Sequence, residues 1–192
     1  MSTSQTVNPT SQPGGLPPDW PSRILLRPAE ESDLIGMEWE GEFTRYRRNY
    51  AEAYTRSKRG LSLIWLLDLP GVGLVGQVLV QLKMDDRSYA NGRTRAYIHS
   101  FRVREGLRGY GLGTRLMAHA EKDLAERGFH EVTLNVAEEN EGALRLYKRL
   151  GYRILKKIPG RWSYFDEKGV LRHVTEPGFQ LIKRLRQLTE RA

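Results

Sequence analysis

The sequence predicts an α/β fold of the α+β kind, with a mixed, mostly antiparallel sheet of six or seven strands flanked by about four helices. Residues 61–103 indicate consecutive strands, because apolar residues alternate or run together there between turn residues. A helix then follows, since leucine and alanine recur every four residues at Leu112, Leu116, Ala120 and Leu124. This helix precedes another strand at 130–136, and a strand–helix–strand crossover places its two strands parallel.

Local signals define each element in chain order. A short strand begins the fold at residues 24–26, and Ser32 or Asp33 caps the helix after it. A second helix lies within residues 40–59, and the nearly continuous apolar run at 61–67 is typical of a strand covered on both faces. The remaining predicted elements are a strand at 72–84 after the turn Pro70-Gly71, a strand at 94–103, a helix from 112 that ends at Gly128, a strand at 130–136, a helix at 140–150 capped by Asn140 and closed by Gly151, and strands at 152–157, 161–165 and 174–183.

The length and composition fit one domain that follows a proline-rich leader. The chain has 192 residues, which is within the usual size of a single domain. Residues 1–22 hold five of the nine prolines together with Ser, Thr, Gln and Gly, so they bury too little apolar area to fold. We therefore expect a disordered leader at residues 1–22 and a single domain at residues 23–192.

The composition also excludes several classes of function. No stretch approaches the roughly 20 apolar residues of a membrane-spanning helix, so no membrane partner is expected. The absence of cysteine excludes disulfides, Cys-ligated zinc and thiol nucleophiles. The 31 Lys and Arg against 23 Asp and Glu give a net charge of +8, which suits an anionic cofactor or nucleic acid, but the basic residues are scattered. Residues 1–20 resemble no secretion signal, so a cytoplasmic location is expected.

Two glycine-rich segments are candidates for a nucleotide-binding motif. Gly71-Val72-Gly73-Leu74-Val75-Gly76 precedes alternating valines instead of a helix, so we predict a hairpin turn there. Arg108-Gly109-Tyr110-Gly111-Leu112-Gly113-Thr114 follows a strand and opens a helix. Its alternate glycines expose successive N–H groups, which together with the positive end of the helix can hold an anion. We therefore predict a ligand that carries phosphates. Because neither GKS nor GKT follows, the segment is not the phosphate-binding loop of a nucleotide-hydrolysing enzyme.

The second segment resembles part of a known family. Phe101, Val103 and the spacing Arg108-x-x-Gly111-x-Gly113 are similar to the acetyl-CoA-binding segment of the GCN5-related N-acetyltransferase (GNAT) superfamily. The similarity covers about residues 24–158 and is strongest over 97–152. It continues in order and spacing through Leu134-Asn135-Val136, Asn140, Ala143, Leu146-Tyr147 and Leu150-Gly151-Tyr152. The resemblance implies the GNAT fold, with a β-α-β unit that binds acetyl-CoA.

The resemblance also implies roles for single residues. Main-chain groups of Phe101 and Val103 would pair with the pantetheine arm, and N–H groups of the glycine segment would hold the pyrophosphate. Tyr147 would be the general acid for the leaving thiolate, because a phenol with a pKa of about 10 keeps its proton at neutral pH. Helical spacing alone gives Tyr147 a second interpretation, as a buried core residue. The implied cofactor-binding residues are Phe101, Val103, Arg108, Gly109, Tyr110, Gly111, Leu112, Gly113, Thr114, Asn140 and Tyr147.

The general base is left open by the sequence. Many protein N-terminal acetyltransferases of the superfamily carry a glutamate at the position of Asn135, whose amide cannot accept the proton of the amine. His99 is the candidate base, because its ordinary pKa is about 6.5. It alternates with Phe101 and Val103 and is expected on their face of the strand, where a structural histidine is the other interpretation. Three carboxylates are weaker candidates: Glu40, Glu42 and Asp166.

The predicted activity is the transfer of an acetyl group from acetyl-CoA to a primary amine of a small molecule or peptide, without a metal. The second helix, rich in Tyr and Arg, and the hairpin at 162–177 are expected to line the acceptor pocket and to favour an anionic or aromatic acceptor. Two alternatives stay open: a GNAT fold that binds acyl-CoA without catalysis and acts in regulation or interaction, and a basic nucleic-acid-binding module, for which no recognition motif is found. A homodimer also stays open.

Overall fold

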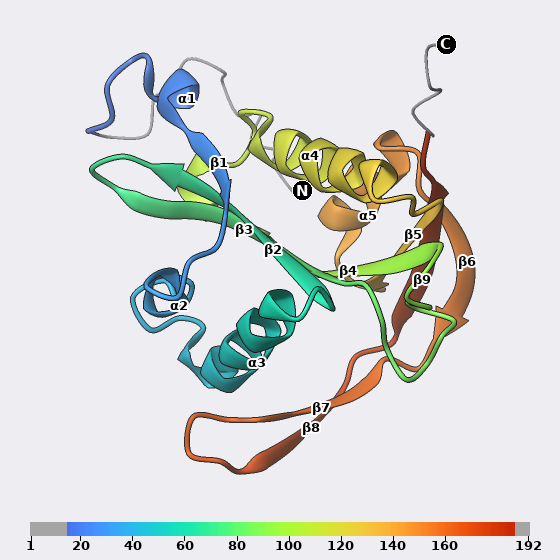
Figure 1. Cartoon of the computed structure of the whole chain (residues 1–192). Helices are drawn as coiled ribbons and strands as arrows, with labels where there is room; N and C mark the ends of the chain where they lie inside the picture. The colour runs from blue at the N-terminus through green and yellow to red at the C-terminus, as the bar shows by residue number, and fades with distance from the viewer. Residues whose placement is uncertain (1–14, 187–192) are drawn as a thin grey trace, which may run out of the picture.

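The computed structural model describes residues 15–186 and shows a central sheet with helices on both faces (Figure 1). The helices are α1 (Trp20–Arg23), α2 (Asp33–Gly36), η1 (Thr44–Tyr46), α3 (Arg47–Lys58), η2 (Glu105–Leu107), α4 (Leu112–Glu126) and α5 (Glu141–Arg149). The strands are β1 (Leu25–Pro28), β2 (Ser62–Leu69), β3 (Gly73–Gln81), β4 (Arg95–Val103), β5 (Glu131–Ala137), β6 (Arg153–Ile158), β7 (Arg161–Phe165), β8 (Leu171–Thr175) and β9 (Gly178–Arg184). Within residues 15–186, no helix is long and apolar enough to cross a membrane.

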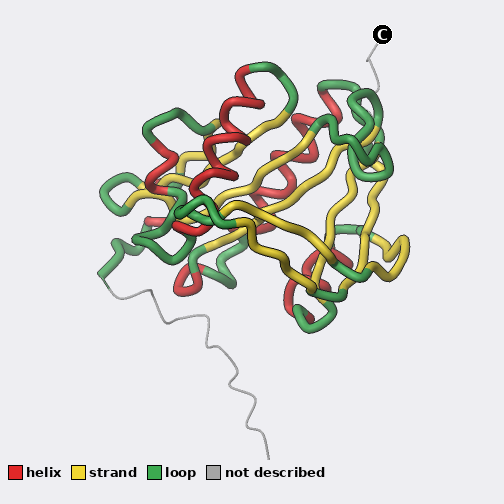
Figure 2. The backbone as a smooth tube through the Cα atoms, turned by 90° about the horizontal axis from the view of Figure 1, so that it is seen from below, coloured by secondary structure: helices red, strands yellow, loops and turns green. Residues whose placement is uncertain are grey.

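Seven of these strands form one mixed sheet in the order β1-β2-β3-β4-β5-β9-β6, and they lie side by side in Figure 2. Every neighbouring pair is antiparallel except β4 and β5, which are parallel from Arg95 opposite Glu131 to Ile98 opposite Leu134. The helix α4 connects these two parallel strands, as the predicted strand–helix–strand crossover requires. The predicted fold class, a mixed and mostly antiparallel sheet with flanking helices, is confirmed.

Two cores hold the layers together, one on each face of the sheet (Figure 1). On one face, α4 buries the side chains that recur every four residues in the sequence, Leu112, Leu116, Ala120 and Leu124. On the other face, α3 packs Tyr50 and Ala53 against the sheet. The continuous apolar run of β2 serves both cores, because Leu66 lies in the second core and Leu67 in the first, each fully buried.

The fold begins earlier than the sequence predicts. Trp20 lies within the expected leader, yet its side chain is only 1% exposed and belongs to the core under α4. Pro21 at the start of α1 lacks an N–H that this turn would leave unpaired, so the proline-rich composition is compatible with helix there. The expected boundary at residue 22 is therefore wrong for residues 15–22, and the rest of the predicted leader, residues 1–14, lies outside the described residues.

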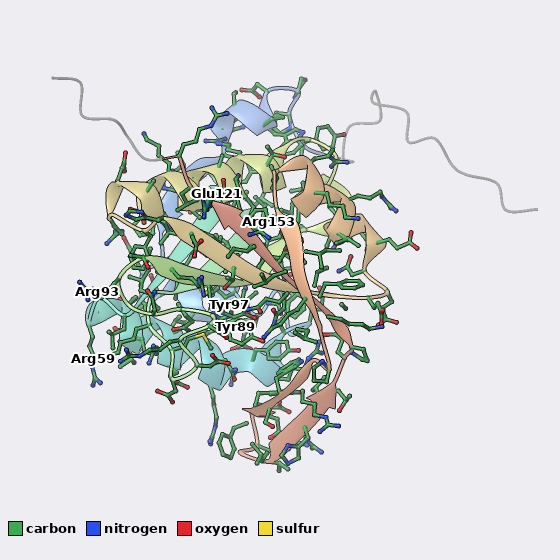
Figure 3. The ribbon with its side chains drawn as sticks, turned by 90° about the vertical axis from the view of Figure 1, so that its right-hand side faces the viewer. Arg59, Tyr89, Arg93, Tyr97, Glu121 and Arg153 are labelled. Carbon is green, nitrogen blue, oxygen red and sulfur yellow. The ribbon has the colours of Figure 1, made fainter. Side chains whose placement is uncertain are left out.

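The predicted strand at 174–183 is two strands in the structure. The first part belongs to β8, which pairs with β7, and the second part is β9, which pairs with β5 and β6. The break falls at Glu176 and Pro177, where proline has no N–H for a ladder hydrogen bond. As a result β7 and β8 form a separate hairpin that projects from the body of the protein (Figure 3).

Candidate active site

The sheet opens between β4 and β5. Their parallel ladder ends at Ile98 and Leu134, whereas β4 continues to Val103 along β3, and β5 continues to Ala137 along β9. Beyond Ile98 the two strands therefore diverge, and their facing edges have no ladder partner among the described residues. An extended ligand with amide groups can add to such an edge as a further strand would. This is the place at which the sequence predicts the pantetheine arm.

A β-bulge at Ser100 sets which side chains of β4 face each side of the sheet. Ser100 has a φ of +49°, and the ladder with β3 shifts from Leu79 opposite His99 to Gln77 opposite Arg102. One residue is thereby taken out of the alternation. Phe101 packs with the core under α4, and His99 and Arg102 lie on the opposite face. The prediction that His99 shares a face with Phe101 and Val103 is wrong, because alternation does not continue through a bulge.

The glycine segment connects β4 to α4. Gly111 occupies the N-cap position of α4 with a φ of +79°, in the left-handed region that favours glycine. The first N–H groups of this 15-residue helix have no carbonyl of a preceding turn to bond and so remain available to an anion. Gly113 has a second function, since a Cβ atom there would lie 3.0 Å from Cζ of Phe101. The backbone geometry therefore fits a pyrophosphate held at the start of α4.

The glycine segment before α4 carries one further cation, Arg108. The guanidinium of Arg108 is largely exposed, donates a hydrogen bond to the carbonyl of Val103 at 3.1 Å and lies 3.8 Å from the carboxylate of Glu105. An exposed arginine beside a helix N-terminus adds to its attraction for phosphate.

Tyr147 and Asn140 lie at either end of α5. The Oδ1 atom of Asn140 accepts the N–H of Ala143 at 3.0 Å, so the predicted helix cap is confirmed. Tyr147 is 6% exposed, and its ring centroid lies 6.1 Å from that of Phe101 and 5.7 Å from that of Tyr152. Burial raises the pKa of its hydroxyl above the ordinary value for tyrosine, so the group keeps its proton at neutral pH.

His99 lies on the other side of the opening. Its ring stacks on Tyr97, with centroids 5.6 Å apart and planes at 9°, and its Nδ1 atom lies 3.2 Å from Oγ of Ser100. Burial and, to a lesser extent, the charge of Arg102 lower the pKa of His99 to about 4. The imidazole is therefore neutral at neutral pH and can accept a hydrogen bond, but it is a weak base. The Oδ1 atom of Asn135 is buried at the same opening without a hydrogen-bond partner among the described residues.

Two of the three carboxylates that the sequence suggests as weaker bases are occupied by other partners. Glu40 is held by Arg104 through two contacts of 2.8 Å. Asp166 accepts N–H groups in the β7–β8 turn and pairs with Arg172 at 2.8 Å. Both have a lowered pKa because of these hydrogen bonds, which makes them weaker proton acceptors. Glu42 lines a small cavity that is described below.

A large cleft of about 1070 Å³ lies on the face opposite α4. Its walls are α3, the ends of β4 and β5, and the hairpin, whose Trp162 and Tyr164 rings lie 6.2 and 5.0 Å from Tyr46. Tyr89 and Tyr97 meet edge to face at the far wall, with centroids 5.1 Å apart (Figure 3). The prediction that the second helix and the hairpin line a common pocket matches this geometry. Residues that line the cleft include Tyr46, Tyr50, Tyr97, His99, Asn135 and Trp162.

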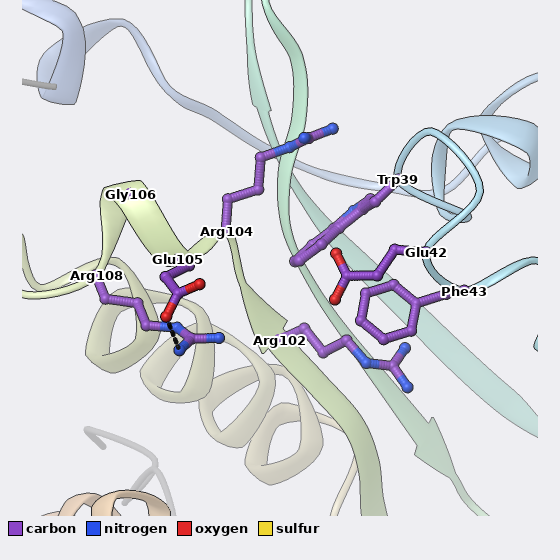
Figure 4. A pocket seen from close by; sticks show the side chains of 8 residues that line it. All are labelled: Trp39, Glu42, Phe43, Arg102, Arg104, Glu105, Gly106 and Arg108. Atoms are coloured by element: carbon purple, nitrogen blue, oxygen red, sulfur yellow. Dashed lines mark ion pairs between the residues drawn. The ribbon is translucent and has the colours of Figure 1, made fainter. Parts of the chain in front are cut away.

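A second cavity of about 270 Å³ lies at the end of β4 (Figure 4). Trp39 and Phe43 from the segment between α2 and η1 face three arginines, Arg102, Arg104 and Arg108. Arg102 also lines the large cleft and is the residue common to both linings. Arg102 faces the cleft because of the bulge at Ser100, and the alternation of residues in β4 does not reveal this.

The sequence also matches a known protein family over the residues that form this site. A profile of the Acetyltransferase (GNAT) family matches residues 26–152, which is most of the described chain and includes the opening, the glycine segment and α5. The chain belongs to the GNAT family. The resemblance seen in the glycine segment is thus confirmed over the whole span from β1 to the end of α5.

Relatives within the GNAT family share parts of the chain. An N-alpha-acetyltransferase MAK3 from Arabidopsis thaliana is 41% identical over 64 residues, which are 33% of this chain and 34% of the relative. The chain thus matches about a third of the length of that protein. An L-methionine sulfoximine/L-methionine sulfone acetyltransferase from Pseudomonas aeruginosa is 27% identical over 114 residues, covering 56% of this chain and 63% of the relative.

Solved GNAT structures share the fold over nearly the whole described chain. The ribosomal-protein-S18-alanine N-acetyltransferase from Escherichia coli superimposes with a TM-score of 0.63 at 18% identity, covering 88% of this chain and 98% of that one. The NAA60 protein of Arabidopsis thaliana, solved in complex with acetyl-CoA, gives a TM-score of 0.62 at 22% identity, covering 84% and 98%. At these identities the likeness concerns the fold alone.

Proposed function

We propose that the protein is an acetyl-CoA-dependent N-acetyltransferase that acts on a primary amine. One observation carries the proposal: the opening between β4 and β5 lies between the glycine-capped start of α4 and the large cleft on the opposite face. A pantetheine arm placed in the opening would bring a thioester to the cleft, while its pyrophosphate stays at the helix N-terminus. Membership of the GNAT family and the acetyl-CoA complex of a related structure support the assignment.

The chemistry that we propose is direct attack of the amine on the thioester. The nitrogen bonds to the acetyl carbon, the carbon–sulfur bond breaks, and the departing thiolate takes a proton from Tyr147 while the amine loses one. Because burial keeps Tyr147 protonated at neutral pH, a proton is present for the thiolate. Because Asn135 cannot accept a proton and His99 has a low pKa, we infer that the amine arrives already neutral or loses its proton through water. His99 would then accept a hydrogen bond from the amine rather than act as a strong base.

The acceptor is a small molecule or a peptide with a primary amine. The relatives that match by sequence are named as an N-alpha-acetyltransferase and as an L-methionine sulfoximine/L-methionine sulfone acetyltransferase, and a spermidine/spermine N-acetyltransferase from Vibrio cholerae shares the fold. Both kinds of acceptor fit a cleft of about 1070 Å³. The cytoplasmic location and the homodimer stay predictions.

The test is release of CoA thiol from acetyl-CoA in the presence of a panel of amines, with binding of CoA measured by calorimetry. An acetyltransferase releases thiol only when a suitable amine is present. The alternative, a fold that binds acyl-CoA without catalysis, predicts binding of CoA and no amine-dependent release with any member of the panel. A protein that neither binds CoA nor releases thiol would contradict both assignments.

A further inference from the structure

We propose that Arg102 binds a carboxylate of the acceptor, so that the substrates of the cleft are primary amines that also carry a carboxylate. The inference rests on the acetyltransferase function proposed above. It follows from the position of Arg102 beyond the Ser100 bulge, where its side chain lines both the large cleft and the small cavity.

The guanidinium of Arg102 is held in place by neutral groups. Its Nη1 atom donates a hydrogen bond to the hydroxyl of Tyr50 at 2.7 Å. Its central carbon lies 4.0 Å from the ring centroid of Phe43 and 5.3 Å from that of Tyr46. Stacking on aromatic rings fixes the plane of a guanidinium but uses none of its five N–H donors. The group is therefore oriented in advance, with donors left for a ligand.

No carboxylate among the described residues lies within 4 Å of Arg102. Three other partly buried arginines are paired with carboxylates, with contacts of 2.6 Å for Arg27 with Asp33, 2.7 Å for Arg95 with Glu131 and 2.8 Å for Arg104 with Glu40. Arg102 is likewise partly buried, and a bidentate carboxylate is the ligand that the planar fork of an arginine fits best.

The charges around Arg102 leave this site open to an anion. Glu42 and Glu105 line the small cavity with it, but both are exposed, and Glu105 lies near Arg108 at 3.8 Å. The large cleft is also lined by four carboxylates and four further cations: Glu52, Asp85, Asp86 and Glu176, and Arg56, Lys83, Lys156 and Arg161. An incoming carboxylate would therefore reach Arg102 without net repulsion from the charges that line the cleft.

Arg102 also lies near the place of reaction. The charge of Arg102 contributes to the lowered pKa of His99, which lies where β4 parts from β5. Two groups of one small acceptor can therefore be recognised together, with the amine at the opening and the carboxylate at Arg102. A free amino acid and a peptide with an acidic first residue share this chemistry, and the experiment distinguishes them.

The experiment compares acceptors that differ only in a carboxylate and its amide. One arm uses peptides that begin with Glu or Gln, and the other uses 4-aminobutanoate and 4-aminobutanamide; kcat/KM is measured at saturating acetyl-CoA. A charge-assisted contact contributes about 1.5–3 kcal/mol, so the wild-type protein should prefer the carboxylate by about tenfold or more in at least one arm. The arm that shows the preference identifies the source of the carboxylate.

The variant Arg102→Gln should lose this preference, so that the ratio of kcat/KM for the carboxylate to kcat/KM for the amide falls from about tenfold to about one. Arg45→Gln is the matched control, because Arg45 also lies over Tyr46, at 4.8 Å, but is exposed and lines neither cavity. This control should keep the preference. If Arg102→Gln fails to fold, Tyr50→Phe removes the hydroxyl that orients Arg102 and keeps the ring, and it should weaken the preference.

Two results would overturn the role of Arg102: an active wild-type protein without preference in either arm, or an Arg102→Gln variant that loses rate equally with both members of a pair and keeps the preference. The second result would show that Arg102 only fastens α3 to β4. Failure of the proposed acetyltransferase function would look different, because no amine would then release thiol from acetyl-CoA, whether or not calorimetry detects binding of CoA.

Discussion

The indole ring of Trp20 meets the ring of Tyr110 edge to face, with centroids 5.0 Å apart. Trp20 comes from the proline-rich start of the chain, and Tyr110 comes from the glycine segment that opens α4. The contact therefore joins the N-terminal segment to the loop at which we place the pyrophosphate. A segment that composition alone marks as a leader has a structural connection to the cofactor site.

We expect Trp20→Ala to destabilise the protein and to weaken CoA binding. Truncation of a fully buried aromatic ring usually lowers the free energy of unfolding by about 3–5 kcal/mol, which lowers the melting temperature by several degrees. A chain that starts at Ser22 should behave in the same way. A chain that starts at Gly15 is the control, and if its melting temperature fell as far, the loss could not be assigned to Trp20.

Gly111→Glu should lower the affinity for CoA more than tenfold, or by about 1.4 kcal/mol, because it brings a negative charge to the pyrophosphate site. Gly71→Glu is the matched control. Both glycines have a positive φ, +79° and +83°, and neither has an atom within 4 Å of an added Cβ, so the backbone strain is similar. Gly71 lies in the β2–β3 turn, outside the glycine segment. Calorimetry that found equal losses of affinity in both variants would remove the assignment of the glycine segment.

Tyr147→Phe should leave CoA affinity nearly unchanged and lower the single-turnover rate by about 10²-fold, since it removes the proton of the general acid and keeps the ring. Tyr152→Phe tests whether any buried hydroxyl nearby has the same effect. The hydroxyl of Tyr152 donates to Glu121 at 2.9 Å, so its loss should affect stability rather than turnover. A Tyr147→Phe variant that acetylates at the wild-type rate would show that Tyr147 is only a core residue.

The pH dependence of stability should carry a signature of His99. Its pKa is about 4 in the folded protein and about 6.5 in the unfolded chain, so the unfolded chain binds more protons between these values. Stability should therefore be fully present above pH 6.5 and decline as the pH falls toward 4. In chemical denaturation, His99→Gln should reduce the loss over this range. A His99→Gln variant whose stability falls with pH as steeply as that of the wild type would contradict this assignment.

Much of the fold could be predicted because its signals are local. The repeat of Leu112, Leu116 and Ala120 marks the buried face of α4, and Asn140 is a helix cap both in the pattern and in the structure. Burial of Trp20 depends on contacts with residues far along the chain, so composition could not reveal it.

The candidate site is less accessible to sequence reasoning than the fold. Spacing and family resemblance locate the glycine segment and Tyr147, but not the neighbours that surround them. The position of His99 depends on the Ser100 bulge, and the pairing of Glu40 with Arg104 depends on residues that lie 64 positions apart. Neither relation follows from periodicity, because each is decided by the tertiary packing of distant segments.

Because of the bulge at Ser100, the number of residues in β4 matters for the structure as much as their identity. Deletion of one residue from this strand would restore simple alternation. The side chains of either the half before Ser100 or the half after it would then move to the opposite face of the sheet. If the half after Ser100 changed faces, Arg102 would lie in the apolar core below α4. If the half before Ser100 changed faces, Ile98 would leave that core. A point substitution in β4 can therefore change one residue that lines the cleft. A deletion would change the residues on both faces of the sheet at once, the face under α4 and the face of the cleft.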